Sequence, residues 1–313
     1  MRPPANIAAL HGAYWGSDRQ YRMWWYVWPL SLALLVCGWI YLDKSGTRTA
    51  SAPGASSQAG WGKPVATTTS QPVRHSPILA NWPEKLHNDV MVCFSNAIDL
   101  NPLIDACTRL IESSEVANPQ LAAAHNQRGY LQRLTQPDRA LEDFDAALKL
   151  LPNMAVALTN RAFIYMTRSR FDSAIEDLNG AIELFPPPFA ARARYLRGFS
   201  YARLKDYDKA MADLNEAQRV EPNNPDPYLA RGEVEQVQQH YDAALRDFDE
   251  FSKRVPRDAR GLIARAAVLE TTGRPEQALA ALDNAISLDP ANARVLTARD
   301  RLRAQQKEGN QPK

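Results

Sequence analysis

Residues 155–186 read AVALTNRAFIYMTRSRFDSAIEDLNGAIELFP. In the first part, Leu158, Ala162 and Tyr165 fall on one stripe of a helix, because residues three and four apart share a face. In the second part, Ala174 and Leu178 form a similar stripe, and the stretch closes on a proline, which cannot continue a helix. The stretch therefore predicts two antiparallel helices joined by a short turn, with small residues that let them approach closely.

The same pattern occurs five times between residues 122 and 290. Successive closing prolines lie 34, 36, 34 and 34 residues apart. A period near 34 is typical of helix–turn–helix arrays, in which each unit buries its apolar face against its neighbours. The small residues are Gly129, Ala162, Gly198, Gly232 and Ala266, the alanines are Ala140, Ala174, Ala210, Ala244 and Ala278, and the prolines are Pro152, Pro186, Pro222, Pro256 and Pro290.

This pattern resembles the tetratricopeptide repeat, which has Gly or Ala and Tyr on the first helix, then Ala-x-x-x-Phe/Leu and a closing Pro. The resemblance implies an all-α, right-handed α-solenoid whose first helices line a concave groove for an extended peptide or a helix. We expect five repeats over residues 120–290, a capping helix over 291–306 and a disordered tail over 307–313. The other matching sets are Gly129/Ala140/Phe144, Gly198/Tyr201/Ala210/Leu214, Gly232/Ala244/Phe248 and Ala266/Ala278/Leu282.

Residues 85–119 look like a degenerate helix pair. We expect a first helix from His87 to Asp99, a break at Asn101-Pro102, and a second helix that contains Cys107. In an oxidising compartment Cys93 and Cys107 could form a disulfide, and closing a loop of about 15 residues would stabilise the fold by about 3 kcal/mol. The alternative is that both cysteines are small buried hydrophobic side chains.

An arginine precedes each small residue, and in four units an aspartate follows on the second helix. We expect structural ion pairs within the units: Arg128 with Asp143, Arg161 with Asp177, Arg197 with Asp213, and Arg231 with Asp247. The alternative is an arginine ladder for acidic ligands. Arg265 has Ala281 at the acid position, so we expect this arginine to be free.

The run from residue 23 to residue 42 contains no charged residue and has aromatic side chains at both ends. About 20 apolar residues cross a bilayer, and interfacial belts favour Trp and Tyr. We predict a short N-terminal segment (1–22), a transmembrane helix (23–42) and a disordered Ser/Thr/Pro/Gly-rich tether (43–84). The location expected is the bacterial inner membrane, single-pass, with periplasmic repeats. The alternatives are a cleaved export signal and an inverted topology with cytosolic repeats.

Composition and motifs argue against other classes of function. The formal charge of +2 gives no strong electrostatic footprint for nucleic acid. The five histidines show no metal-ligand spacing, and no phosphate-binding loop or nucleophile elbow occurs. We therefore expect no catalytic residue, no cofactor and no metal, and the chain is not expected to be an enzyme.

The function expected is a membrane-anchored protein–protein interaction scaffold that binds a peptide or helix of a protein partner. The alternative is a substrate-presenting or accessory subunit of an envelope enzyme or assembly complex. Side chains that turn away from the second helices would form the partner-binding groove, and aromatic residues and arginines are favoured on recognition surfaces. These are Tyr130, Arg133, Phe163, Met166, Arg192, Tyr195, Phe199 and Arg203.

Overall fold

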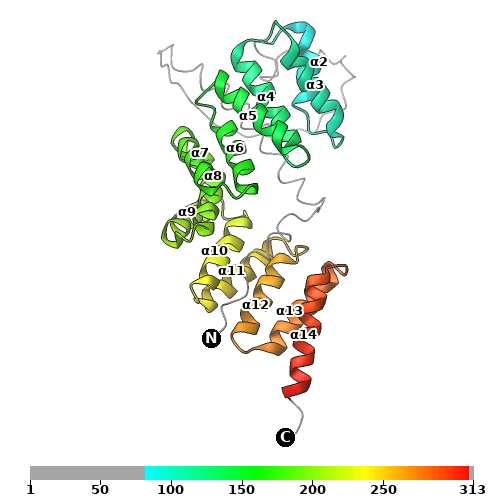
Figure 1. Ribbon diagram of the computed structural model, residues 1–313, viewed down its shortest axis with the longest axis vertical. Helices are drawn as coiled ribbons and strands as arrows, with labels where there is room; N and C mark the ends of the chain where they lie inside the picture. The colour runs from blue at the N-terminus through cyan, green and yellow to red at the C-terminus, as the bar shows by residue number, and fades with distance from the viewer. Residues whose placement is uncertain (1–81, 310–313) are drawn as a thin grey trace, which may run out of the picture. The chain divides into compact units, whose positions relative to one another are not determined.

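The computed structural model describes residues 82–309, and this part of the chain is helical throughout, with thirteen α-helices, two short 3-10 helices and no strand (Figure 1). It divides into two units, Met1–Leu131 and Gln132–Lys313. The predicted N-terminal segment, the transmembrane helix and the tether up to residue 81 lie outside the described residues, as do residues 310–313 of the predicted tail.

The first unit contains η2 (Glu84–Leu86), α2 (His87–Cys93), α3 (Leu100–Glu112) and most of α4 (Asn118–Gln132). Its core cluster includes Val90, Leu103 and Leu110. The expectation of a helix up to Asp99 was wrong. This residue instead caps α3, since its Oδ1 accepts a hydrogen bond from the amide of Asn101 at 3.1 Å. Pro102 does not break a helix, because it lies in the first turn of α3, where backbone N–H groups have no intrahelical acceptor.

The second unit stacks its helices in the order of the chain. Helix α5 (Pro137–Leu150) packs on α6, and α6 pairs with α7. The pairs α8 with α9, α10 with α11 and α12 with α13 follow, and each second helix contacts the first helix of the next pair. The bounds are α6 (Ala155–Thr167), α7 (Phe171–Leu184), η3 (Pro187–Phe189), α8 (Ala191–Arg203), α9 (Tyr207–Val220), α10 (Asp226–Val237), α11 (Tyr241–Arg254), α12 (Arg260–Thr271), α13 (Pro275–Leu288) and α14 (Ala293–Gly309).

The small residues of the first helices set the distance within a pair. A Cβ at Gly232 would lie 2.6 Å from Cε1 of Phe248, a fully buried ring on α11. A Cβ at Gly198 would lie 2.9 Å from Cγ of Leu214 on α9. Both contacts are too short for real atoms, so a larger side chain at either glycine would push the two helices apart.

The turn between the two helices has the same conformation in four pairs of the second unit. Ser169, Lys205, Gln239 and Gly273 all have positive φ, between 57° and 70°. Only the last of them is glycine, the residue that adopts this left-handed conformation without steric cost.

The last helix closes the second unit. Val295 and Leu302 of α14 are buried in one cluster with residues of α12 and α13. The helix also carries arginines that reach carboxylates of the preceding pair, including Arg301 with Glu270 at 2.7 Å. One apolar side and one polar side are what the end of a helical array requires.

Candidate functional site

The first helices of successive pairs in the second unit contact one another in the order α6, α8, α10 and α12. On α8, Arg197 turns toward α9, where its guanidinium meets Asp213. Residues on the opposite side of this helix, by the 3.6-residue period, are Arg192, Phe199 and Arg203. We call the equivalent sides of α6, α8, α10 and α12 the first-helix face.

The structure gives the predicted groove residues different degrees of burial. Met166, Arg192, Tyr195, Phe199 and Arg203 are half-buried on α6 and α8. Phe163 is only 6% exposed and belongs to a core cluster with residues of α5, so it offers little surface to a partner.

Two further predicted groove residues lie close to the border between the units. Tyr130 belongs to the first unit and Arg133 to the second. Their membership of one groove with the residues of α6 and α8 stays a prediction.

Near the first-helix face of α10 and α12 lie three charged residues that the sequence prediction did not select. They are Asp226, Asp258 and Arg260. Nη2 of Arg260 lies 3.8 Å from Asp226 and 2.8 Å from Asp258. Asp226 and Arg260 follow Arg192 at intervals of 34 residues, the repeat period, and this register could have identified them.

Burial dominates the electrostatics of this face. It raises the pKa of Asp226, while the charges of Arg260 and Arg192 oppose the rise. Burial also raises the pKa of Glu233 to about 8, with Arg260 opposing. The pKa of the Tyr195 hydroxyl is raised by burial and by the charge of Asp226. On this face, the ionised form of a carboxyl group is therefore disfavoured unless an arginine lies close to it.

Three of the four expected ion pairs are present in the second unit. Nη2 of Arg161 lies 2.7 Å from Oδ1 of Asp177, and the Nε of the same arginine lies 2.8 Å from Oδ2. The same two-point geometry joins Arg197 to Asp213 and Arg231 to Asp247. These hydrogen bonds raise the pKa of each arginine. The pair Arg128–Asp143 falls across the two units and stays a prediction.

Each of these arginines also reaches the second helix of the preceding pair, which the sequence prediction missed. Nη1 of Arg161 contacts Asp145 at 2.7 Å, that of Arg197 contacts Asn179 at 2.7 Å, and that of Arg231 contacts Asn215 at 2.9 Å. The expectation that Arg265 is free was wrong, because its Nε lies 3.0 Å from Oδ1 of Asp249. These arginines thus link neighbouring pairs of helices as well as the two helices of one pair, and the signal was a polar residue 16 to 18 positions before each arginine.

Cys93 and Cys107 are joined by a disulfide in the first unit, with their Cα atoms 4.9 Å apart. Both side chains are completely buried. The bridge fastens the short α2 to α3, and Nε2 of Gln127 on α4 donates to the Cys93 carbonyl at 3.2 Å.

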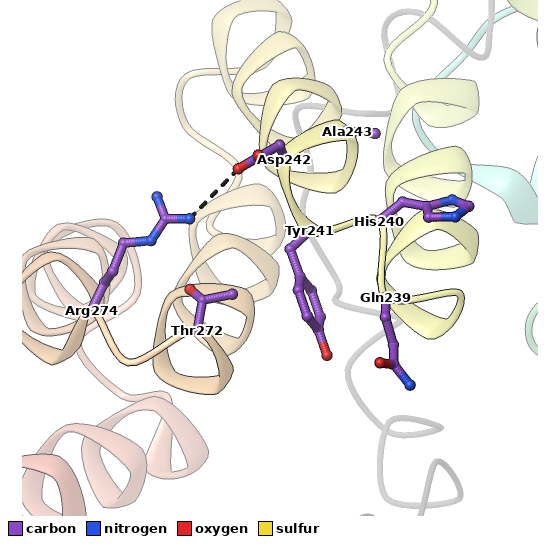
Figure 2. Close-up of a pocket in the computed structure, with 7 residues that line it drawn as sticks. All are labelled: Gln239, His240, Tyr241, Asp242, Ala243, Thr272 and Arg274. Carbon is purple, nitrogen blue, oxygen red and sulfur yellow. Dashed lines mark ion pairs between the residues drawn. The ribbon is translucent and has the colours of Figure 1, made fainter.

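A shallow depression lies between two turns of the second unit (Figure 2). Its volume is about 390 Å³. On one side, Nη2 of Arg274 lies 3.6 Å from Oδ1 of Asp242. His240 bonds instead to Glu235 at 2.7 Å, so no base is held against a nucleophile here. The lining residues are Gln239, His240, Tyr241, Asp242, Ala243, Thr272 and Arg274.

Within residues 82–309, no three His, Cys, Asp or Glu side chains are grouped so that they could hold a metal ion.

Comparison with known proteins identifies the repeats. A family model described as "Tetratricopeptide repeat" matches residues 130–187, 159–226 and 229–293, which together cover more than half of the chain. The chain therefore belongs to the tetratricopeptide repeat family. Proteins of this family mediate protein–protein interactions and peptide binding.

Two curated relatives match short stretches. Hsp70-Hsp90 organizing protein 3 of Arabidopsis thaliana is 28% identical over 116 residues, which are 36% of this chain and 20% of that protein. Dynein axonemal assembly factor 4 of Rattus norvegicus is 29% identical over 91 residues, 27% of this chain and 22% of that protein. The chain spans about a fifth of the length of these relatives.

Two solved structures share the fold. PilW, described as a widely conserved type IV pilus biogenesis factor, aligns with a TM-score of 0.62 at 17% identity over 69% of this chain and 99% of its own. A tetratricopeptide repeat protein from Parabacteroides merdae aligns with a TM-score of 0.56 at 24% identity, over 67% of this chain and 81% of its own. At these identities the likeness establishes the fold alone.

Proposed function

We propose that this protein is a membrane-anchored interaction scaffold that binds an extended peptide or a helix of a partner protein on its first-helix face. The observation that carries the proposal is the arrangement on α8, where half-buried Phe199, Arg192 and Arg203 lie on the side opposite Arg197 by the helical period. Phe199 also packs against the cluster of Ala210, Leu214, Ala230 and Val234, which holds its ring in place. Aromatic rings and arginines dominate the energetics of protein interfaces.

Binding without catalysis is the chemistry that the described residues favour. The arginines of the ladder are engaged by carboxylates and amides of the protein itself. The depression in Figure 2 is shallow and offers no activated nucleophile. The repeats then act as a surface rather than as a reaction site.

The membrane anchor in this proposal is residues 23–42, and its support is the uncharged, aromatic-flanked sequence. None of the helices in the described part of the chain, which excludes that stretch, combines the length and the apolarity that crossing a bilayer demands. A periplasmic position for the repeats is supported by the Cys93–Cys107 disulfide, since disulfides persist in oxidising compartments.

Site-specific photo-crosslinking of the full-length chain in its native cells tests the binding face. A photoreactive amino acid in place of Phe199 is expected to capture a discrete partner. The same amino acid in place of Lys253, an exposed residue of the second helix α11, is expected not to. Equal capture at both positions would refute the first-helix face as the binding surface.

Alkylation in intact cells tests the location. Cys93 and Cys107 should resist a thiol reagent in denatured chains and react after treatment with a reductant. Reaction of both cysteines without a reductant would place the repeats in the cytosol instead.

A further inference from the structure

The two sulfur atoms of the Cys93–Cys107 bridge lie out of reach of solvent. Both cysteines are completely buried, in the core cluster that α2, α3 and α4 share in the first unit (Figure 1). Leu103 and Leu110 of α3 and Ala124 of α4 belong to the same cluster. In thiol–disulfide exchange the attacking sulfur has to reach the sulfur that it attacks. A disulfide donor therefore cannot contact either cysteine while the three helices are packed together.

The packing of α2 is what buries Cys93. This helix has only seven residues, too few for a stable helix by itself, and Cys93 is its last residue. The Cys93 carbonyl accepts a hydrogen bond from Nε2 of Gln127 on α4 at 3.2 Å. Oδ1 of Asp89 on α2 accepts hydrogen bonds from Nε and Nη2 of Arg109 on α3, at 2.9 Å and 2.6 Å. Before these contacts form, the segment that contains Cys93 is open to a reagent.

The bridge can form in this open segment. The two cysteines are 14 residues apart in the chain. A flexible loop of about ten residues closes in about 10–100 ns, whereas disulfide formation takes about seconds to hours. The two sulfur atoms therefore meet many times during one exchange reaction, and α2 does not have to be packed to bring them together.

We propose that a disulfide donor oxidises Cys93 and Cys107 while α2 is still open, and that the packing of α2 on α3 and α4 then buries the bridge. The chain is thus a substrate for thiol–disulfide exchange, a role that is separate from binding at the first-helix face. The thiolate of one cysteine attacks the donor's disulfide, and one donor thiol leaves. The thiolate of the other cysteine attacks the resulting mixed disulfide, and the second donor thiol leaves. The donor gains the two electrons and two protons that the cysteines lose.

Exchange follows the same path in both directions, so reduction of the bridge in the folded protein tests the proposal. Purified full-length chain carrying Cys37→Ser is treated with dithiothreitol in buffer and in urea, and free thiols are measured over time. We expect reduction in buffer to be at least about tenfold slower, the ratio that a local opening of about 1.4 kcal/mol produces.

An exposed mixed disulfide corrects for the effect of urea on the reaction itself. It is made with glutathione at Ile98→Cys, in a chain in which the other cysteines are replaced. Ile98 is 85% exposed in the same unit, so the rate at this position should not depend on unfolding.

Loosening α2 should make the bridge accessible. Gln127→Ala removes the hydrogen bond to the Cys93 carbonyl and is expected to accelerate reduction in buffer about fivefold, with no change in urea. The matched control is Gln306→Ala, which removes a side-chain hydrogen bond to Glu276 in the second unit and should leave both rates unchanged.

Trapping in cells identifies the source of the oxidising disulfide. In full-length Cys37→Ser/Cys107→Ser, Cys93 cannot close the bridge, so its mixed disulfide with the donor is expected to persist after an acid quench and alkylation. A protein-sized adduct that a reductant releases identifies a protein donor, and a glutathione-sized mass increase identifies glutathione disulfide.

Two results would overturn the inference. One is equal rates of reduction in buffer and in urea after the correction, and the other is no mixed disulfide on this chain or on Cys37→Ser/Cys93→Ser. Neither result bears on crosslinking from Phe199, which tests the proposed function independently.

Discussion

Arg161 of α6 joins two neighbouring pairs of helices, because its Nη1 lies 2.7 Å from Oδ1 of Asp145 on α5 while its Nε and Nη2 hold Asp177 on α7. Arg197, Arg231 and Arg265 occupy the same place on later first helices. Side chains with several fixed donors are suited to this role, since one guanidinium can bond two partners at once.

Removing one arginine of this ladder is expected to be costly. Arg231→Met leaves the carboxylate of Asp247, which is 5% exposed, without its two-point partner. Because the pair is only partly buried, we expect a loss of about 2–3 kcal/mol in the free energy of unfolding, measured by urea denaturation. The double variant Arg231→Met/Asp247→Leu should recover most of it. Arg219→Ala, which breaks an exposed pair with Glu216, should cause no measurable change.

The close approach of α10 and α11 gives a second expectation. Gly232→Ala places a methyl group against the ring of Phe248, and overpacking of this kind costs about 1–3 kcal/mol. Adding Phe248→Leu should relieve the clash, so the double variant should lose less stability than the sum of the two single variants. Additive losses in thermal denaturation would show that the contact does not set the helix spacing.

The left-handed turn residues predict stabilising and destabilising changes at equivalent positions. Lys205→Gly removes the steric cost of φ at 66° and should stabilise the second unit by about 0.5–1 kcal/mol. Gly273→Ala should destabilise it by about 1 kcal/mol through the backbone alone, since no atom lies within 4 Å of the added Cβ. Shifts of the same sign in both variants would be inconsistent with this explanation.

The disulfide predicts a local effect in the first unit. Replacing both cysteines, Cys93→Ala/Cys107→Ala, should lower stability by about 3 kcal/mol, since a closed loop of this length restricts the unfolded chain by that amount. Amide hydrogen exchange should accelerate most in α2, which has seven residues and is too short to be stable by itself. Uniform acceleration over α5 to α14 would contradict a local role.

The raised pKa of Glu233 predicts a pH dependence. Folding favours the protonated carboxyl, so its contribution to stability is complete below the ordinary pKa near 4.5 and is lost as the pH rises through about 8. Glu233→Gln cannot ionise, so its stability relative to wild type should increase between pH 5.5 and 8.5. Because the side chain is half-buried, we expect about 1 kcal/mol.

Glu216→Gln is the control for this pH series. The hydrogen bond from Arg219 lowers the pKa of Glu216, so that group does not titrate in this interval. If the difference in stability between Glu233→Gln and wild type is the same at pH 5.5 and at pH 8.5, folding does not favour the protonated form of the Glu233 carboxyl.

The amino-acid sequence by itself determined the repeating pairs of helices, because the period of 34 and the helical spacing of small and apolar residues are local properties of the chain. It also indicated the pairs Arg161–Asp177, Arg197–Asp213 and Arg231–Asp247, since each spans one turn of fixed length.

Only the tertiary structure decided the contacts between neighbouring pairs of helices. Examples are Arg265 of α12 with Asp249 of α11, and Arg197 of α8 with Asn179 of α7. The physical reason is that these relationships depend on how one pair of helices is rotated against the next. That rotation follows from the packing of many side chains together, and no single spacing along the chain specifies it.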